Sequence, residues 1–209
     1  MKEFLKLNRK KLKFAFGLTF ITFTVIVLGI FLYSYVQGLG PESTLFITVI
    51  LGFGIGLPFF IFLVSTIRGS WDLRKRRSAF NQEPFLDLLH HGFSEHMKNE
   101  NNRWKFVEPV LRGKVDDYQI VAEVNTQFAP DVIRFQALTE IHVISKDEIK
   151  RLSKKFAIQG IELDYEGVTK MISVKKHRLK SGVDLITELN HFIFTIKSEK
   201  FKPLKIGID

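Results

Sequence analysis

FAFGLTFITFTVIVLGIFLYSYV, residues 14–36, and STLFITVILGFGIGLPFFIFLVSTI, residues 43–67, contain no Asp, Glu, Lys or Arg. The apolar core of a lipid bilayer is about 30 Å thick, and a helix of about 20 apolar residues crosses it. Lipid offers no partner to an unpaired backbone group, so such a segment must be helical. The sequence therefore predicts a transmembrane hairpin made of helices 14–36 and 43–67.

Two other interpretations of these runs are less favoured. The core helices of a soluble protein rarely stay uncharged over such lengths. A cleavable signal peptide has a shorter apolar region, and Ser34-Tyr35-Val36-Gln37 lacks the small-x-small pattern of a cleavage site.

The net charge of +9 is concentrated beside the two runs. Residues 1–13 carry six positive charges and one negative, and residues 68–77 carry five and one, whereas residues 78–209 carry 20 and 19. Lys and Arg beside membrane spans stay on the cytoplasmic side. We therefore expect both termini in the cytoplasm, with the loop 37–42 on the far side, and a near-neutral domain that does not bind nucleic acid.

The same basic flanks, 1–13 and 68–77, are expected to contact the anionic headgroups of membrane lipid. Each cation near such a surface contributes about 1 kcal/mol. The residues predicted to do so are Lys10, Lys11, Lys13, Arg74, Lys75, Arg76 and Arg77.

The second run contains a small-x-x-x-small pair, Gly52 and Gly56, followed by Pro58. Such a pair lets two helix backbones approach closely, and a proline removes one helical hydrogen bond. The pattern indicates a kinked helix with an association face for the other helix of the hairpin or for a second subunit. Glycine is also common in membrane helices without any such role. Neither run holds an ionisable residue, which argues against a pump or transporter made from this chain alone.

Residues 78–209 are long enough for one soluble domain. Apolar periodicity, turn residues and caps predict helices and strands in the order α-βββ-α-ββ-α, which is an α+β fold with an antiparallel sheet. The predicted elements are a helix 83–98, strands 104–111, 118–124 and 132–143, a helix from Ser145 to Gly160, strands 161–165 and 169–175, and a helix 181–200.

This order of elements, with the pattern Leu185-Ile186-Thr187-Glu188-Leu189-Asn190 in the last helix, resembles the type III secretion chaperone-like fold over residues 83–200. That fold is also found in small bacterial proteins outside secretion systems. The resemblance implies a domain that binds partner proteins, often as a dimer, and is not an enzyme. Two membrane helices are a departure from the soluble secretion chaperones. Because the proteins that it resembles are bacterial, we expect the chain to lie in the bacterial inner membrane.

Candidate catalytic chemistry is sparse. His91 and Glu95 have the i, i+4 spacing of two metal ligands on one helix, but a structural or solvated histidine cluster is the favoured interpretation. The sequence has no G-x-S-x-G, no phosphate-binding loop of the Walker type and no G-x-G-x-x-G. We therefore assign no catalytic residue and expect no cofactor.

The leading hypothesis is a membrane-anchored, non-enzymatic protein whose cytoplasmic domain binds another protein, within a membrane complex or a homo-oligomer. One alternative is a membrane-tethered, metal-dependent hydrolase centred on His91 and Glu95. Another is an oligomeric pore or channel subunit built on the helix that carries Gly52 and Gly56.

Overall fold

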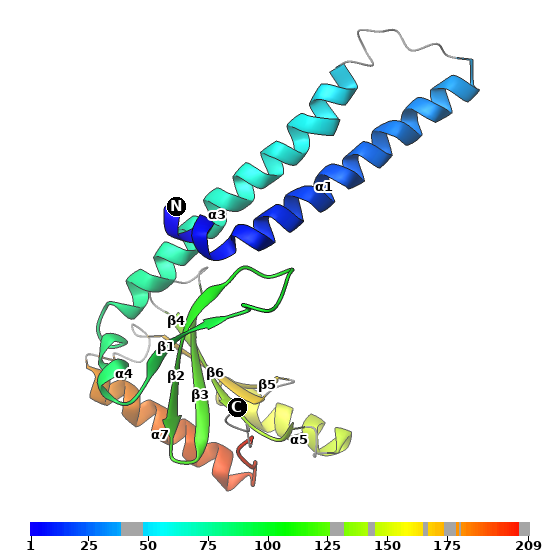
Figure 1. Ribbon diagram of the computed structural model, residues 1–209. Helices are drawn as coiled ribbons and strands as arrows, with labels where there is room; N and C mark the ends of the chain where they lie inside the picture. The colour runs from blue at the N-terminus through cyan, green and yellow to red at the C-terminus, as the bar shows by residue number, and fades with distance from the viewer. Residues whose placement is uncertain are drawn as a thin grey trace. The chain divides into compact units, whose positions relative to one another are not determined.

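The computed structural model describes residues 1–38, 48–125, 132–141, 145–164, 167–173, 179 and 181–204. It divides into two compact units. In Figure 1 the ribbon is coloured by residue number, from blue at the N-terminus to red at the C-terminus. The hairpin unit comprises Met1–Leu73 and Asn99–Val107, and the sheet unit comprises Arg74–Lys98 and Glu108–Asp209. Most of the predicted loop 37–42, the start of the predicted helix 43–67 and the last residues of three predicted strands lie outside the described ranges.

The hairpin unit is built from helices. These are α1 (Lys2–Val36), a π-helical stretch η1 (Ile50–Gly56) and α3 (Leu57–Phe80), whose last residues belong to the sheet unit. Stretches Lys2–Val36 and Gly52–Phe80 are long and apolar enough to cross a membrane. Helix α1 contains the predicted span 14–36 and also the basic stretch before it, and the described residues of the predicted span 43–67 are helical and continue into the basic stretch 68–77.

The π-helical turn lies directly before Pro58. The Leu57 N–H donates to the carbonyl of Gly52, five residues back. A proline has no N–H for the carbonyl four residues before it, and a wider turn is one way in which a helix accommodates that loss. Where the sequence indicated a kink at Pro58, the structure has this turn.

The sheet unit has an α+β fold. Its elements are α4 (Leu86–His90), β1 (Ser94–Lys98), β2 (Glu108–Val115), β3 (Tyr118–Val124), β4 (Val132–Leu138), α5 (Lys146–Ala157), β5 (Ile161–Asp164), β6 (Gly167–Ser173) and α7 (Gly182–Ser198). The six strands form one sheet in the order β1-β2-β3-β4-β6-β5, and every neighbouring pair is antiparallel. The predicted α+β class with an antiparallel sheet is confirmed.

The predicted helix 83–98 is wrong. Only Leu86–His90 is helical; Gly92 follows with a φ of +83°, and Ser94–Lys98 pairs with β2 as a strand. That helix was predicted from the spacing of Phe85, Leu88, Leu89 and Phe93; three of these are buried, but Leu89 is 41% exposed, so the spacing predicted most of the burial and not the backbone conformation. The described sheet therefore has six strands instead of the five predicted, with β1 where the second part of a helix was expected. The predicted strand 104–111 is shifted too, since β2 begins at Glu108.

The elements with strong local signals are confirmed. β3 matches the predicted strand 118–124. Ser145 caps α5, because its hydroxyl accepts a hydrogen bond from the Glu148 N–H. At the start of α7, Ser181 and Asp184 form a reciprocal capping box.

One core joins the sheet to its helices. Buried side chains of β3 and β4, such as Ile120 and Phe135, share an apolar cluster with Phe156 of α5 and Phe192 of α7. Tyr118 ties the tail to this core, since its hydroxyl donates to the Phe201 carbonyl at an O···O distance of 2.5 Å. Burial raises the pKa of the Tyr118 hydroxyl, so the group keeps the proton that it donates at neutral pH.

A substitution at Gly167 can test the contact between β4 and β6. A Cβ atom at this position would lie 2.1 Å from the Ala137 carbonyl oxygen, which is backbone and cannot rotate away. We expect Gly167→Ala to destabilise the sheet unit by about 3 kcal/mol, as overpacking does. Gly160→Ala is the control, because that site has open space and only a φ of +68°, which costs an alanine about 1 kcal/mol. Hydrogen exchange of β4 and β6 peptides in the full chain measures both; equal losses of protection would contradict the predicted clash.

Candidate membrane-surface site

The described structure brings the segment Asn99–Val107, which lies between β1 and β2, into the same compact unit as the start of α1. This segment is neither helix nor strand. Asn8, at 0% exposure, makes the first contact between the two: its side-chain oxygen accepts a hydrogen bond from the Val107 N–H at 2.8 Å, and its side-chain nitrogen donates to the Phe4 carbonyl at 3.3 Å. Both ends of one buried amide are therefore satisfied within the hairpin unit.

Lys11 makes the second contact. Its ammonium group donates to the Lys105 carbonyl at 2.8 Å and also to the Asn99 carbonyl. The residue is only 9% exposed. Lys11 was predicted to contact lipid headgroups, but its charge instead holds the two ends of the segment Asn99–Val107. A charged donor to a carbonyl is worth more than a neutral one, at about 1.5–3 kcal/mol.

Aromatic contacts fix the same segment. The rings of Phe4 and Phe106 meet edge to face at a centroid distance of 5.0 Å. Phe4 also lies against Gly69, where a Cβ atom would come within 2.3 Å of the ring. Phe4, Leu12 and Leu73 form a small core of their own, against which Phe106 packs.

Trp104 is presented outward by this segment. The Asn102 side-chain oxygen accepts hydrogen bonds from the backbone N–H groups of Trp104 and Lys105, at 2.9 and 3.3 Å. The Trp104 side chain is 75% exposed, and its ring meets Phe14 edge to face at 5.3 Å. Phe14 is the first residue of the uncharged run, so Trp104 lies beside the point where that run begins. Tryptophan side chains are enriched at this level of membrane proteins.

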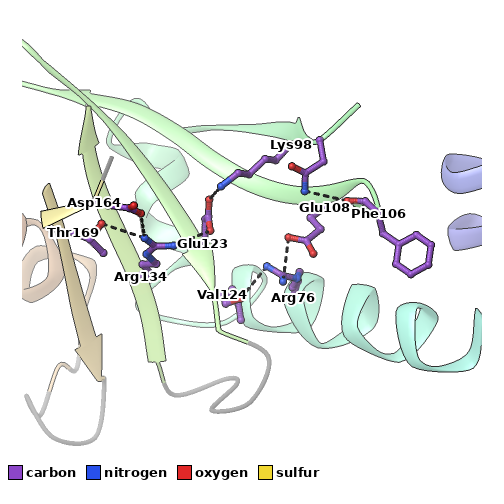
Figure 2. A network of polar contacts seen from close by, with 10 residues as sticks. Arg76, Lys98, Phe106, Glu108, Glu123, Val124, Arg134, Asp164 and Thr169 are labelled. Atoms are coloured by element: carbon purple, nitrogen blue, oxygen red, sulfur yellow. Dashed lines mark hydrogen bonds and ion pairs between the residues drawn. The ribbon is translucent and has the colours of Figure 1, made fainter. Parts of the chain in front are cut away.

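The remaining predicted headgroup cations divide into two groups. Lys10, Lys13 and Arg74 are exposed, as expected for residues that contact solvent or lipid headgroups. Arg76 is instead engaged within the sheet unit, where its guanidinium lies 3.2 Å from the Glu108 carboxylate and donates to the Val124 carbonyl at 3.0 Å (Figure 2). The other two, Lys75 and Arg77, are half-buried.

Figure 2 also shows a row of alternating charges across the sheet. Lys98 of β1 pairs with Glu123 of β3, which lies 4.0 Å from Arg134 of β4. Arg134 continues the row to Asp164 of β5 at 2.5 Å and donates to the Thr169 hydroxyl at 3.4 Å. Because each charge has an opposite neighbour, this row ties four strands together by cross-strand pairing.

The glycine pair does not face the other helix of the hairpin. Gly52 and Gly56 are exposed, and a Cβ atom built on Gly52 meets nothing within 4 Å. Pro58 and Gly54, by contrast, are buried. Gly52 therefore makes no close approach to α1 among the described residues, and association of the glycine pair with another helix or a second subunit stays a prediction.

The candidate metal site required His91 and Glu95 to lie one turn apart on the same helix, and they do not. Helix α4 ends at His90, and Glu95 lies in β1, where its carboxylate is 3.6 Å from the Arg77 guanidinium. The two residues therefore do not share a helix face. Among the described residues, no group of three or more His, Cys, Asp or Glu side chains could hold a metal ion.

The chain matches no protein-family model, no curated protein and no solved structure. The function proposed below therefore rests on its own residues and contacts.

The Asn8 contact can be tested by mutation. We expect Asn8→Leu to leave the buried Val107 N–H without a partner, at a cost of about 1–3 kcal/mol. The segment Asn99–Val107 should then open, so that trypsin cleaves after Arg103 and Lys105 several-fold faster in the detergent-solubilised full chain. The control is Asn101→Leu, an exposed position in the same segment. Equal cleavage rates in the two variants would show that Asn8 does not hold the segment.

Proposed function

We propose that this chain is a two-span membrane protein whose sheet unit binds another protein. The membrane part is supported by the lengths and apolar composition of the two helical stretches, 35 and 29 residues. It is also supported by their exposure, since only 6% and 22% of the most apolar 18-residue stretch of each helix is buried inside the protein. The core helices of a soluble protein would bury such apolar stretches, because exposed apolar area costs about 25 cal/mol per Å².

The proposed orientation places both termini in the cytoplasm, in a bacterial inner membrane. It is supported by the asymmetry of charge, since Lys and Arg flank the two runs at 1–13 and 68–77, whereas residues 37–42 carry only Glu42.

A topology experiment tests this orientation. A reporter enzyme that is active only outside the cytoplasm should give no signal when fused after Asp209, and a strong signal when inserted after Gln37. Carbonate extraction of the same fusions should leave them in the membrane pellet. The opposite pair of reporter signals would reverse the orientation, and release into the supernatant would refute the membrane location.

Protein binding is supported by the outer face of α7. The inner face of this helix supplies Leu185, Leu189 and Phe192 to the core. On the opposite face, Phe194 is 70% exposed and Val183 is 65% exposed. The two are 11 residues apart, or about 16 Å along the helix. The side chains between them on this face are Thr187, Asn190 and His191, which are also exposed.

The exposure of Phe194 is the observation that carries the proposal. An aromatic side chain that is apolar, rigid and exposed on a regular helix is the kind of residue that dominates protein interfaces. The resemblance to the secretion chaperone-like fold implies the same class of function. A partner protein or a second copy of this chain would cover the face.

Crosslinking tests the α7 face in native membranes. A photoreactive amino acid replacing Phe194 should form a specific adduct, whereas the same amino acid replacing Ile158 should not. Ile158 is the matched control, because it is 89% exposed but lies at the end of α5. The mass of the adduct distinguishes a second copy from another protein. Adduct formation that is equal at both positions, or absent from both, would contradict binding at this face.

A further inference from the structure

A groove of about 730 Å³ lies between α1 and α3 within the hairpin unit. Five of the side chains that line it are apolar, namely Leu5, Leu12, Phe16, Phe59 and Phe62. Phe16 and Phe62 join the two helices there, with their rings edge to face at a centroid distance of 5.5 Å. Phe59 is 57% exposed, so the apolar surface of the groove is open to the surroundings of the protein.

Three cations complete the lining: Lys6, Arg9 and Lys13. Their spacing of three and four residues places them along one side of α1. All three are exposed, and none of their side chains makes an ion pair or hydrogen bond with another residue in the described part of the chain. No carboxylate lines the groove. Their positive charge is therefore available to an anion, in contrast to that of Lys11.

Along α1, the cations that line the groove come first and the uncharged run follows them. The cations lie at positions 6, 9 and 13, and the uncharged run begins at residue 14. From Lys6 to Phe16 the helix rises about 15 Å. The groove therefore combines a cationic end with an apolar end, and this apolar end belongs to the two predicted membrane spans.

We propose that this groove binds one anionic phospholipid. The phosphate lies against Lys6, Arg9 and Lys13, and an acyl chain lies along Phe16, Phe59 and Phe62. A soluble anion would use the cations and leave the apolar side chains uncovered, and a neutral lipid would do the reverse. The inference rests on the proposed membrane location but not on the proposed orientation or on protein binding.

Lipid binding can be measured by native mass spectrometry of the full chain in detergent, titrated with phosphatidylglycerol and separately with phosphatidylcholine. The groove variant is Arg9→Gln with Lys13→Gln. The control variant is Lys150→Gln with Lys154→Gln, which removes the same charge from exposed positions of α5 in the sheet unit, outside the groove.

We expect the unmodified chain to bind phosphatidylglycerol with a stoichiometry of one and in preference to phosphatidylcholine. The groove variant should bind it about 30-fold more weakly, as the loss of two cations near an anionic group predicts. The control variant should bind as the unmodified chain does. Equal weakening in both variants, or equal binding of the two lipids, would overturn the proposal.

A second measurement needs no variant and so does not depend on how the variants fold. Phosphatidylglycerol with a photoreactive acyl chain should label the peptides that carry Phe16 and Phe59, and unlabelled phosphatidylglycerol should compete several-fold better than phosphatidylcholine. Labelling spread evenly over both helices would overturn the groove. Competition by soluble glycerol phosphate at the same concentration would show a site for a free anion instead of a lipid.

Carbonate extraction of the unmodified chain, done first, separates the two proposals. A chain that leaves the membrane would refute the membrane location and the groove's occupant together. A chain that stays in the membrane but fails the phosphatidylglycerol titration would refute the groove alone.

Discussion

Much of the apolar surface of α1 is exposed among the described residues, and water is an unfavourable surrounding for it. Side chains such as Ile21, Val25 and Leu32 are each about 60% exposed, and the described part of the chain does not cover them. Exposed apolar area of this extent is unfavourable in water, which supports the proposal that the helix lies in an apolar surrounding. Its three threonines do not conflict with such a surrounding, since Thr19, Thr22 and Thr24 each donate a hydrogen bond to the carbonyl four residues before them. A bilayer is the proposed surrounding, and it also contains the anionic phospholipid that we propose for the groove between α1 and α3.

Just before the uncharged run begins at Phe14, two polar residues of α1 lie inside the hairpin unit. Asn8 and Lys11 are polar but buried, so each needs partners that water no longer supplies. The segment Asn99–Val107 provides them as one N–H and two carbonyls. This exchange is mutual, because a segment without regular secondary structure has backbone groups that require partners as well. The buried amide and the buried ammonium therefore explain why a stretch between two strands belongs to the compact unit of the helices.

The parts of the fold that the sequence predicted are those with local causes. The length of the uncharged runs predicts the long helices, and the hydroxyl of Ser145 at the N-cap predicts the start of α5. The errors have non-local causes. Ser94–Lys98 became a strand because β2 lies beside it, and its apolar neighbours have a spacing that also suits a helix. The contacts of Asn8 and Lys11 span 99 and 88 residues, which no window of sequence can show. The only signal for Trp104 in the sequence is its position as an aromatic residue between two cations, Arg103 and Lys105.

Counting charges treats all six cations of residues 1–13 alike, whereas the helix sorts them by face. Phe4, Asn8, Lys11 and Leu12 are spaced by four, three and one residues and are all buried. This is the spacing of one helical stripe, so Lys11 is inside because of its position and not because of its type. Lys6, Arg9 and Lys13 fall on another side and keep their charge available to an anion. The total basicity of such a segment therefore overstates what it offers to lipid headgroups. The helical position of each cation determines whether it stabilises the protein's own backbone or can meet an anionic surface.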